Sequence, residues 1–321
     1  MTGYIIRRLG QAIIVTLGVT LITFILLHSL PGSFARDILG NRAPPEAIAQ
    51  FNHQNGLDRS VFVQYWYFLD HLVLGDPAHS GAHLGYSYQF NRSTDSLLAN
   101  DLPRDVVLGG LSLIFSLLIA IPVGIAQAVR RNGPLDYAGT GVSFLLYSMP
   151  QYAIALLLIQ FLSISFHIFP AEAPQQASAI GMLTHPSGLV LPIASLTLVT
   201  YAQFSRYMRS SAIDTLAQDY MRTARAKGLP ERLVLWRHLL RNSLIAVVTL
   251  VGLSIPYIIT GTLIIEQVFN FPGAGLEYFN AAARNDYEVM LGITVLVGVV
   301  TVVGNLMADI GYAILDPRIR Y

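Results

Sequence analysis

The stretch SAIDTLAQDYMRTARAKGLPERLVLWRHLLRN, residues 211–242, is a polar and basic island between two long apolar runs. Apolar residues recur in its first half at helical spacing, with charged residues between them. These apolar positions are Leu216, Ala217, Tyr220, Met221 and Ala224. The spacing predicts an amphipathic helix, and a polar helix between apolar runs indicates a docking surface.

The ends of this helix carry their own signals. Thr215, with Gln218 three residues later, matches a capping box at the start. Gly228 stands where a helix C-cap is expected, and Pro230 is preset for the first turn of another helix. We therefore expect a helix, a sharp bend and a second helix. A plainer interpretation, a basic loop that only obeys membrane topology rules, stays open at this point.

The composition is that of a membrane protein. Hydrophobic residues make up 53% of the 321 positions, charged residues only 12%, and the mean hydropathy is +0.53. Soluble domains carry about 25% charged residues, so a protein with several membrane spans is the first inference. The chain has no cysteine, which excludes disulfides, thiolate metal sites and cysteine nucleophiles.

Six apolar runs are long enough to predict an all-α protein with six transmembrane helices. They cover residues 9–30, 106–128, 137–166, 189–204, 244–265 and 289–313. Pro150 is expected to kink or interrupt the third run. The predicted organisation is a first span in residues 1–32, a long external segment over 33–105, and a core with the other five spans over 106–321.

The distribution of lysine and arginine predicts the orientation. Most of the 20 cations lie near the N-terminus, after the second run, in the 211–242 island and at the C-terminus. The short loops 165–188 and 266–288 on the other side hold one cation, Arg284. Because short cytoplasmic loops are rich in cations, both termini and the island are predicted to be cytoplasmic.

Several strings resemble one family. DYMRTARAKG, residues 219–228, is similar to the cytoplasmic loop of permease subunits of binding-protein-dependent ABC transporters, in their dipeptide and oligopeptide (nickel-peptide) branch. Residues 4–9, 266–275 and 315–321 resemble that branch as well, so the resemblance covers nearly the whole chain. The family's general pattern is Glu-Ala-Ala, three residues, then Gly. Here Arg222-Thr223-Ala224 precede Gly228, so only the second Ala and the Gly match.

The resemblance implies a function and partners. The chain would form half of a translocation pathway that imports di- or oligopeptides, with nickel, haem or glutathione-like cargo as other possibilities. It would work with a second permease, two ATP-binding subunits that hold ATP and Mg, and an external substrate-binding protein, in the bacterial inner membrane. The residues expected to couple to the ATPases are Asp219, Tyr220, Arg222, Thr223, Ala224, Arg225, Ala226, Lys227 and Gly228.

The sequence lacks the motifs of the catalytic sites considered. The sequence has no G-x-x-x-x-G-K-[ST] phosphate loop, no H-E-x-x-H and no G-x-S-x-G, so neither nucleotide hydrolysis nor a membrane-embedded hydrolase is expected. His79 and His83 have ligand spacing, but Gly81 between them favours a loop, and no metal site is predicted. Asp309, near the cytoplasmic end of the last run, is expected to pair with a basic residue. An ion-coupled secondary transporter remains the alternative function, although it predicts repeats and midplane acids.

Overall fold

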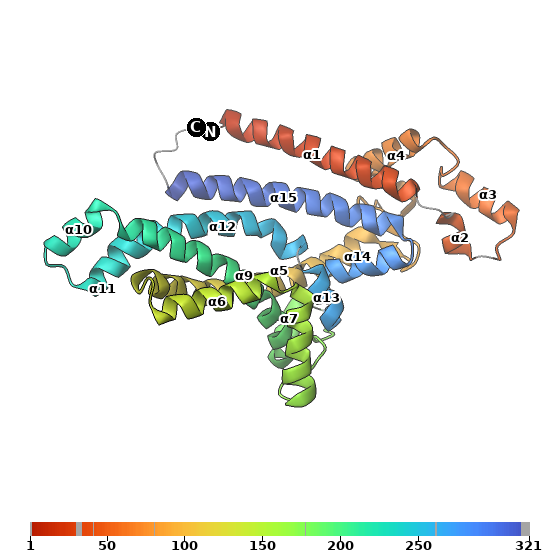
Figure 1. Ribbon diagram of the computed structural model, residues 1–321. Coiled ribbons are helices and arrows are strands. Elements are labelled where there is room, and N and C mark those ends of the chain that lie inside the picture. Colours follow the sequence, from red (N-terminus) through yellow and green to blue (C-terminus); the bar gives the residue numbers. More distant parts are fainter. Residues whose placement is uncertain are drawn as a thin grey trace. The chain divides into compact units, whose positions relative to one another are not determined.

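The computed structural model describes residues 2–29, 34–40, 42–79, 81–176, 178–260 and 262–315, with the backbone alone at 2–9, 12, 37, 256, 259–260 and 308–315 (Figure 1). The chain divides into two compact units. The first comprises Met1–Arg104 and Pro272–Val303, and the second comprises Asp105–Phe271 and Gly304–Tyr321. Each unit is described by itself below.

The first unit is helical with one small hairpin. Its elements are α1 (Thr2–His28), α2 (Phe34–Leu39), α3 (Pro45–Gln54), α4 (Val61–Leu74), the 3-10 turn η1 (Pro77–His79), β1 (Tyr86–Ser87), β2 (Arg92–Ser93), the start of α5 (Thr94–Val129), α14 (Ala274–Ala283) and most of α15 (Tyr287–Leu315). The two strands pair antiparallel, with Tyr86 opposite Ser93. Segments 34–104 and 272–303 therefore belong to one compact body.

The core of the first unit joins helices that are distant in sequence. Phe24 of α1 and Phe68 of α4 are both buried, with ring centroids 6.1 Å apart. Leu98 of α5 and Leu291 of α15 are buried in the same cluster. The segment between α1 and α5 therefore packs on side chains of α1 and α15 through a continuous apolar core.

The second unit consists of helices alone in its described residues. They are the rest of α5, α6 (Pro134–Ser148), α7 (Gln151–Leu158), the π-helix η2 (Ile159–Ser165), α8 (Ala179–Leu183), α9 (Pro186–Leu216), α10 (Asp219–Ala226), α11 (Glu231–Leu233), the π-helix η3 (Val234–Leu240), α12 (Arg241–Thr260), α13 (Leu263–Phe269) and the end of α15. Helix α9 packs against α6, α7 and α12 (Figure 1). It is the element around which this unit is built.

Small and hydroxylated residues bring α5 and α9 close together. Ser116 Oγ donates a hydrogen bond to the carbonyl of Thr197 at 2.9 Å, and Thr197 Oγ1 donates to the carbonyl of Ser112 at 3.3 Å. A Cβ on Gly124 would lie 2.8 Å from Cβ of Met208. Close backbone approach with hydrogen bonds across the helices is typical of helix packing in membranes.

The described helices support a multi-pass, all-α membrane protein. Four of them are long and apolar enough to span a bilayer: Thr94–Val129, Pro186–Leu216, Glu231–Ile255 and Tyr287–Met307. A fifth candidate is the pair Pro134–Ser148 and Gln151–Ser165, which is bent by 104°. In α1 the described apolar stretch, Ile13–His28, is shorter. The count of six spans therefore stays a prediction.

The predicted break at Pro150 is confirmed. Helix α6 ends at Ser148, Met149 is extended with φ −80° and ψ 135°, and α7 starts after Pro150. The residue before a proline is disfavoured in helical conformation, which explains why the helix ends there. The run predicted at 189–204 is part of the longer helix α9, which continues into the basic island.

Candidate functional site

Helix α10 begins three residues after α9 ends. Its N-cap is Gln218, extended at φ −72° and ψ 147°, without a side-chain cap. The predicted capping box was wrong, because Thr215 belongs to α9 and its hydroxyl donates to the carbonyl of Ser211 at 2.8 Å. A threonine that bonds back to the preceding turn stays inside its helix and leaves no oxygen for a cap. Asp219, in the first turn of α10, instead interacts favourably with the positive end of the helix dipole.

The predicted end of this helix is confirmed. The amide of Lys227 donates to the carbonyl of Thr223 at 3.0 Å, and that of Gly228 donates to the carbonyl of Arg225 at 2.9 Å. Gly228 has a φ of +73°, in the left-handed region that favours glycine. Pro230, extended at φ −62° and ψ 140°, precedes the first turn of α11. The 211–242 segment thus forms a helix, a sharp bend and a second helix.

The inner face of α10 is anchored in a small core. Met221 is 0% exposed and Ala224 is 5% exposed. They pack with Ala128 of α5, Ala212 of α9, and Val234 and Leu239 of η3. Burying a methionine completely contributes about 1.5–3 kcal/mol, so α10 is fixed to the helices on both sides of the bend.

The outer face of α10 carries the other expected coupling residues. Eight of the nine positions are exposed: Asp219, Tyr220, Arg222, Thr223, Arg225, Ala226, Lys227 and Gly228. Ala224 is the exception, and its side chain contacts the core. Ala217 and Tyr220 were predicted on the apolar face but are exposed, because the two-residue break between α9 and α10 shifts the helical phase. The result is a cationic surface on a fixed helix.

One ion pair crosses the bend. Arg225 donates from Nη2 and Nε to the carboxylate oxygens of Glu231, at 2.9 and 3.2 Å. The hydrogen bonds to this carboxylate raise the pKa of Arg225 above its ordinary value. Both side chains are half exposed, so the pair contributes little to global stability but fixes the angle between α10 and α11.

A second ion pair fixes the C-terminal part of α9. Arg209 Nε and Nη2 lie 2.5 and 2.8 Å from the two carboxylate oxygens of Asp136, at the start of α6. Asp136 is only 3% exposed, and it also accepts a hydrogen bond from the amide of Asn132 at 3.0 Å. The sequence interpretation missed this pair because the partners are far apart in the chain. A carboxylate in the first turn of the helix that starts at Pro134 was the available signal.

A hydroxyl contact joins α9 to α12 beside the bend. Ser243 Oγ donates to Thr215 Oγ1 at 3.2 Å, and Ser211 Oγ donates to the carbonyl of Ser243 at 3.1 Å. Ser243 and Thr215 are both buried. The helices that enter and leave the 211–242 segment are thus tied to each other as well as to α10.

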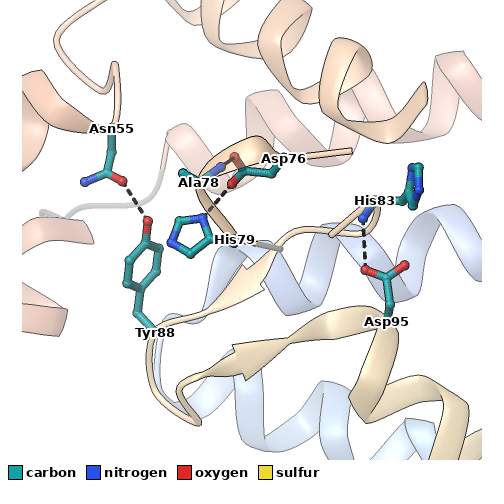
Figure 2. A network of polar contacts seen from close by, with 7 residues as sticks. All are labelled: Asn55, Asp76, Ala78, His79, His83, Tyr88 and Asp95. Carbon is teal, nitrogen blue, oxygen red and sulfur yellow. Dashed lines mark hydrogen bonds and ion pairs between the residues drawn. The ribbon is translucent and has the colours of Figure 1, made fainter. Parts of the chain in front are cut away.

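His79 and His83 have separate partners. His79 Nδ1 lies 2.6 Å from a carboxylate oxygen of Asp76, and its ring stacks on Tyr86. The backbone amide of His83 donates a hydrogen bond to a carboxylate oxygen of Asp95 at 3.0 Å (Figure 2). Within the described residues no group of three or more His, Cys, Asp or Glu side chains could hold a metal ion. The side chain of Asp309 lies outside the described residues.

Comparison with known proteins gives a consistent result. Residues 120–321 match the family described as "Binding-protein-dependent transport system inner membrane component", and residues 1–109 match the corresponding N-terminal family. The chain is 37% identical to the oligopeptide transport system permease protein AppB of Bacillus subtilis, with both chains covered completely. It is 33% identical to the glutathione transport system permease protein GsiC of Salmonella typhimurium, again over the whole of both.

A solved structure supports the fold. The MetNI methionine ABC transporter in an inward-facing conformation aligns with a TM-score of 0.53 at 16% identity, covering 68% of this chain and 97% of that one. The family whose model matches residues 120–321 consists of components of ABC importers, which rules against an ion-coupled secondary transporter. The chain belongs to the family of inner-membrane components of binding-protein-dependent transport systems.

Proposed function

We propose that this chain is the permease subunit of an ATP-driven importer of di- or oligopeptides, and that it forms half of the translocation pathway. The support for the substrate class is that relatives over the full length are oligopeptide and dipeptide permeases from several bacteria. Nickel, haem or glutathione-like cargo would be accommodated by the same architecture. The proposed topology has six spans with both termini in the cytoplasm, α1 being the first span.

The proposed partners follow from the family. A second permease completes the pathway, two ATP-binding subunits hold ATP and Mg, and an external binding protein delivers the substrate. The external protein would approach segment 33–105. No ATP chemistry is assigned to this chain, which has no phosphate-binding loop.

In the proposed coupling mechanism, α10 carries force from the ATPases to the membrane helices. When the ATPase pair closes, it displaces the exposed face of α10. Because Met221 is packed between α5, α9 and η3, and Arg225 is paired with Glu231, the displacement moves α9 and α12 instead of being absorbed by a flexible loop. Rigid-body tilting of these helices would open the pathway to one side or the other.

One observation carries this proposal: a short helix whose inner face is fully buried presents a cationic outer face at a rigid bend. The test is purification of the tagged chain from membranes. ATP-binding subunits are expected to co-purify, and transport of a labelled dipeptide in vesicles should need ATP and all subunits. Uptake by the lone chain driven by an ion gradient would contradict the proposal.

A further inference from the structure

Helix α4 is apolar on both sides. Its inner face, Tyr65, Phe68, Leu69 and Leu72, packs into the core of the first unit. Its outer face exposes three large side chains along one stripe: Phe62 is 75% exposed, Trp66 70% and Val73 74%. Asp70 is its one acid, and it has no lysine or arginine. A helix that is hydrophobic all round is typical of a protein interior or a membrane, and its outer face here has no protein neighbour in the described chain.

The inner face of α4 reaches far along α1. Tyr65 Oη donates to the carbonyl of Leu17 at 3.0 Å and lies 3.0 Å from Thr20 Oγ1. Near the end of α1, His28 Nε2 lies 3.0 Å from Gln64 Oε1. At a rise of about 1.5 Å per residue, Leu17 is roughly 16 Å along the helix from His28. Because the hydrocarbon core is about 30 Å thick, α4 lies beside the outer half of a membrane span.

The surface next to α4 is already apolar. On α1 of the same unit, Ile13, Ile22 and Leu26 are exposed, as expected for side chains that face lipid. Figure 1 shows α4 alongside the C-terminal part of α1. Phe62, Trp66 and Tyr67, with Val63 and Asp70, line a shallow hollow of about 420 Å³. The outer face of α4 therefore extends the lipid-facing surface of α1.

Both ends of α4 are polar. Before it, His53 pairs with Asp58 at 2.9 Å, and the guanidinium of Arg59 lies 4.9 Å from the centre of the Tyr67 ring and donates to its hydroxyl. After it, Gly75 leads into the polar turn of Asp76 and His79. An apolar helix with Trp and Tyr between polar ends is the pattern of a helix held at a membrane interface.

We propose that α4 lies in the outer leaflet and that Phe62, Trp66 and Val73 contact phospholipid acyl chains. The 33–105 segment is then partly a membrane-embedded layer that braces the first span, and only its remaining part faces the external water. The inference rests on α1 being the first span of the proposed permease. The external binding protein and the second permease are the competing occupants of this face.

The absence of cysteine in the natural chain makes a direct test possible. Phe62→Cys, Trp66→Cys and Val73→Cys are introduced singly, labelled with bimane in the assembled transporter, and reconstituted in phosphatidylcholine vesicles with or without brominated acyl chains. Ile22→Cys on α1 is the lipid-facing control, Gln50→Cys on α3 is the water-facing control, and the unmodified chain gives the background.

Brominated lipid should quench the bimane at Phe62, Trp66 and Val73 nearly as much as at Ile22, whereas aqueous iodide should quench it far less than at Gln50. Stronger quenching by iodide would overturn the proposal, because α4 would then face water. Resistance to both quenchers would also overturn it, because a protein partner would then cover α4.

A second measurement needs no label. The chain has two tryptophans, so Trp236→Phe leaves Trp66 as the only one, and its fluorescence in vesicles of the purified chain should follow brominated lipid rather than iodide. The opposite preference would contradict the proposal. Loss of ATPase co-purification would count against the proposed function alone, since the quenching reports on α4 whether or not an ATPase is bound.

Discussion

Replacing Gly228 by valine perturbs the backbone at the end of α10. Gly228 has a φ of +73°, and a Cβ there would meet nothing within 4 Å. The cost is therefore conformational, at about 1–2 kcal/mol for an L-residue in the left-handed region. A change of this size shifts the equilibrium between the intact and the frayed helix end by roughly 5–30-fold.

Fraying at this point frees the bend between α10 and α11 from a fixed angle. We expect Gly228→Val to lower both dipeptide uptake and substrate-stimulated ATPase activity in vesicles, with normal amounts of the chain in the membrane. Gly228→Asn should be milder, because asparagine tolerates a positive φ. The matched control is Gly141→Val, at an exposed helical position whose Cβ also meets nothing within 4 Å. Wild-type uptake and ATPase activity in Gly228→Val would refute the reasoning.

Three further predictions concern the anchors of the two units. Met221→Ala removes a fully buried side chain, so the 211–242 segment should lose about 2–5 kcal/mol of local stability and become sensitive to limited proteolysis. Met221→Leu keeps the volume of the side chain and should not have this effect. Equal resistance of the two variants to the protease would argue against Met221 as an anchor. Arg209→Met leaves the carboxylate of Asp136 buried without its cation and should destabilise the chain by about 3–5 kcal/mol in thermal unfolding. Adding Asp136→Leu to this variant should recover part of the lost stability. No recovery would mean that the two residues do not stabilise the chain as a pair. Burial raises the pKa of Asp286 although Ser87 donates to it, so the folded first unit binds this proton more tightly than the unfolded chain does. The resulting stability is fully present below the ordinary pKa of 3.8 and is lost as pH rises through the raised value. Asp286→Asn should therefore flatten the thermal stability profile above pH 3.8, and an unchanged slope would contradict this.

The sequence was most informative where one residue type decides the local backbone. Gly228 and Pro150 act through their own φ preferences, and both predicted helix ends are present. The inward positions Met221 and Ala224 followed from helical periodicity, because they lie within one uninterrupted helix.

Local structure was not predictable where one side chain can form either of two local hydrogen bonds. Thr215 can cap a helix or bond back to the preceding turn, and only the length of α9 decides between them. That choice then set the phase that exposes Tyr220.

Long-range contacts were beyond a reading of local pattern. The ion pair of Asp136 and Arg209 joins residues from different helices, and the sequence around either residue does not identify its partner. Helix α4 was missed for a different reason: its apolar residues are diluted in the sequence by the polar residues before and after it. Its contacts with α1, such as that of Tyr65 with Leu17, appear only in the structure.

The central claim is that the exposed face of α10 binds an ATPase subunit. A photo-crosslinking amino acid in place of Arg222 or Lys227, both exposed on that face, tests it in intact membranes, with exposed Gln50 on α3 as the control. The account predicts a crosslinked product with an ATP-binding subunit from Arg222 and Lys227 and none from Gln50. Crosslinks from α10 only to lipid, or to an external protein, would contradict it.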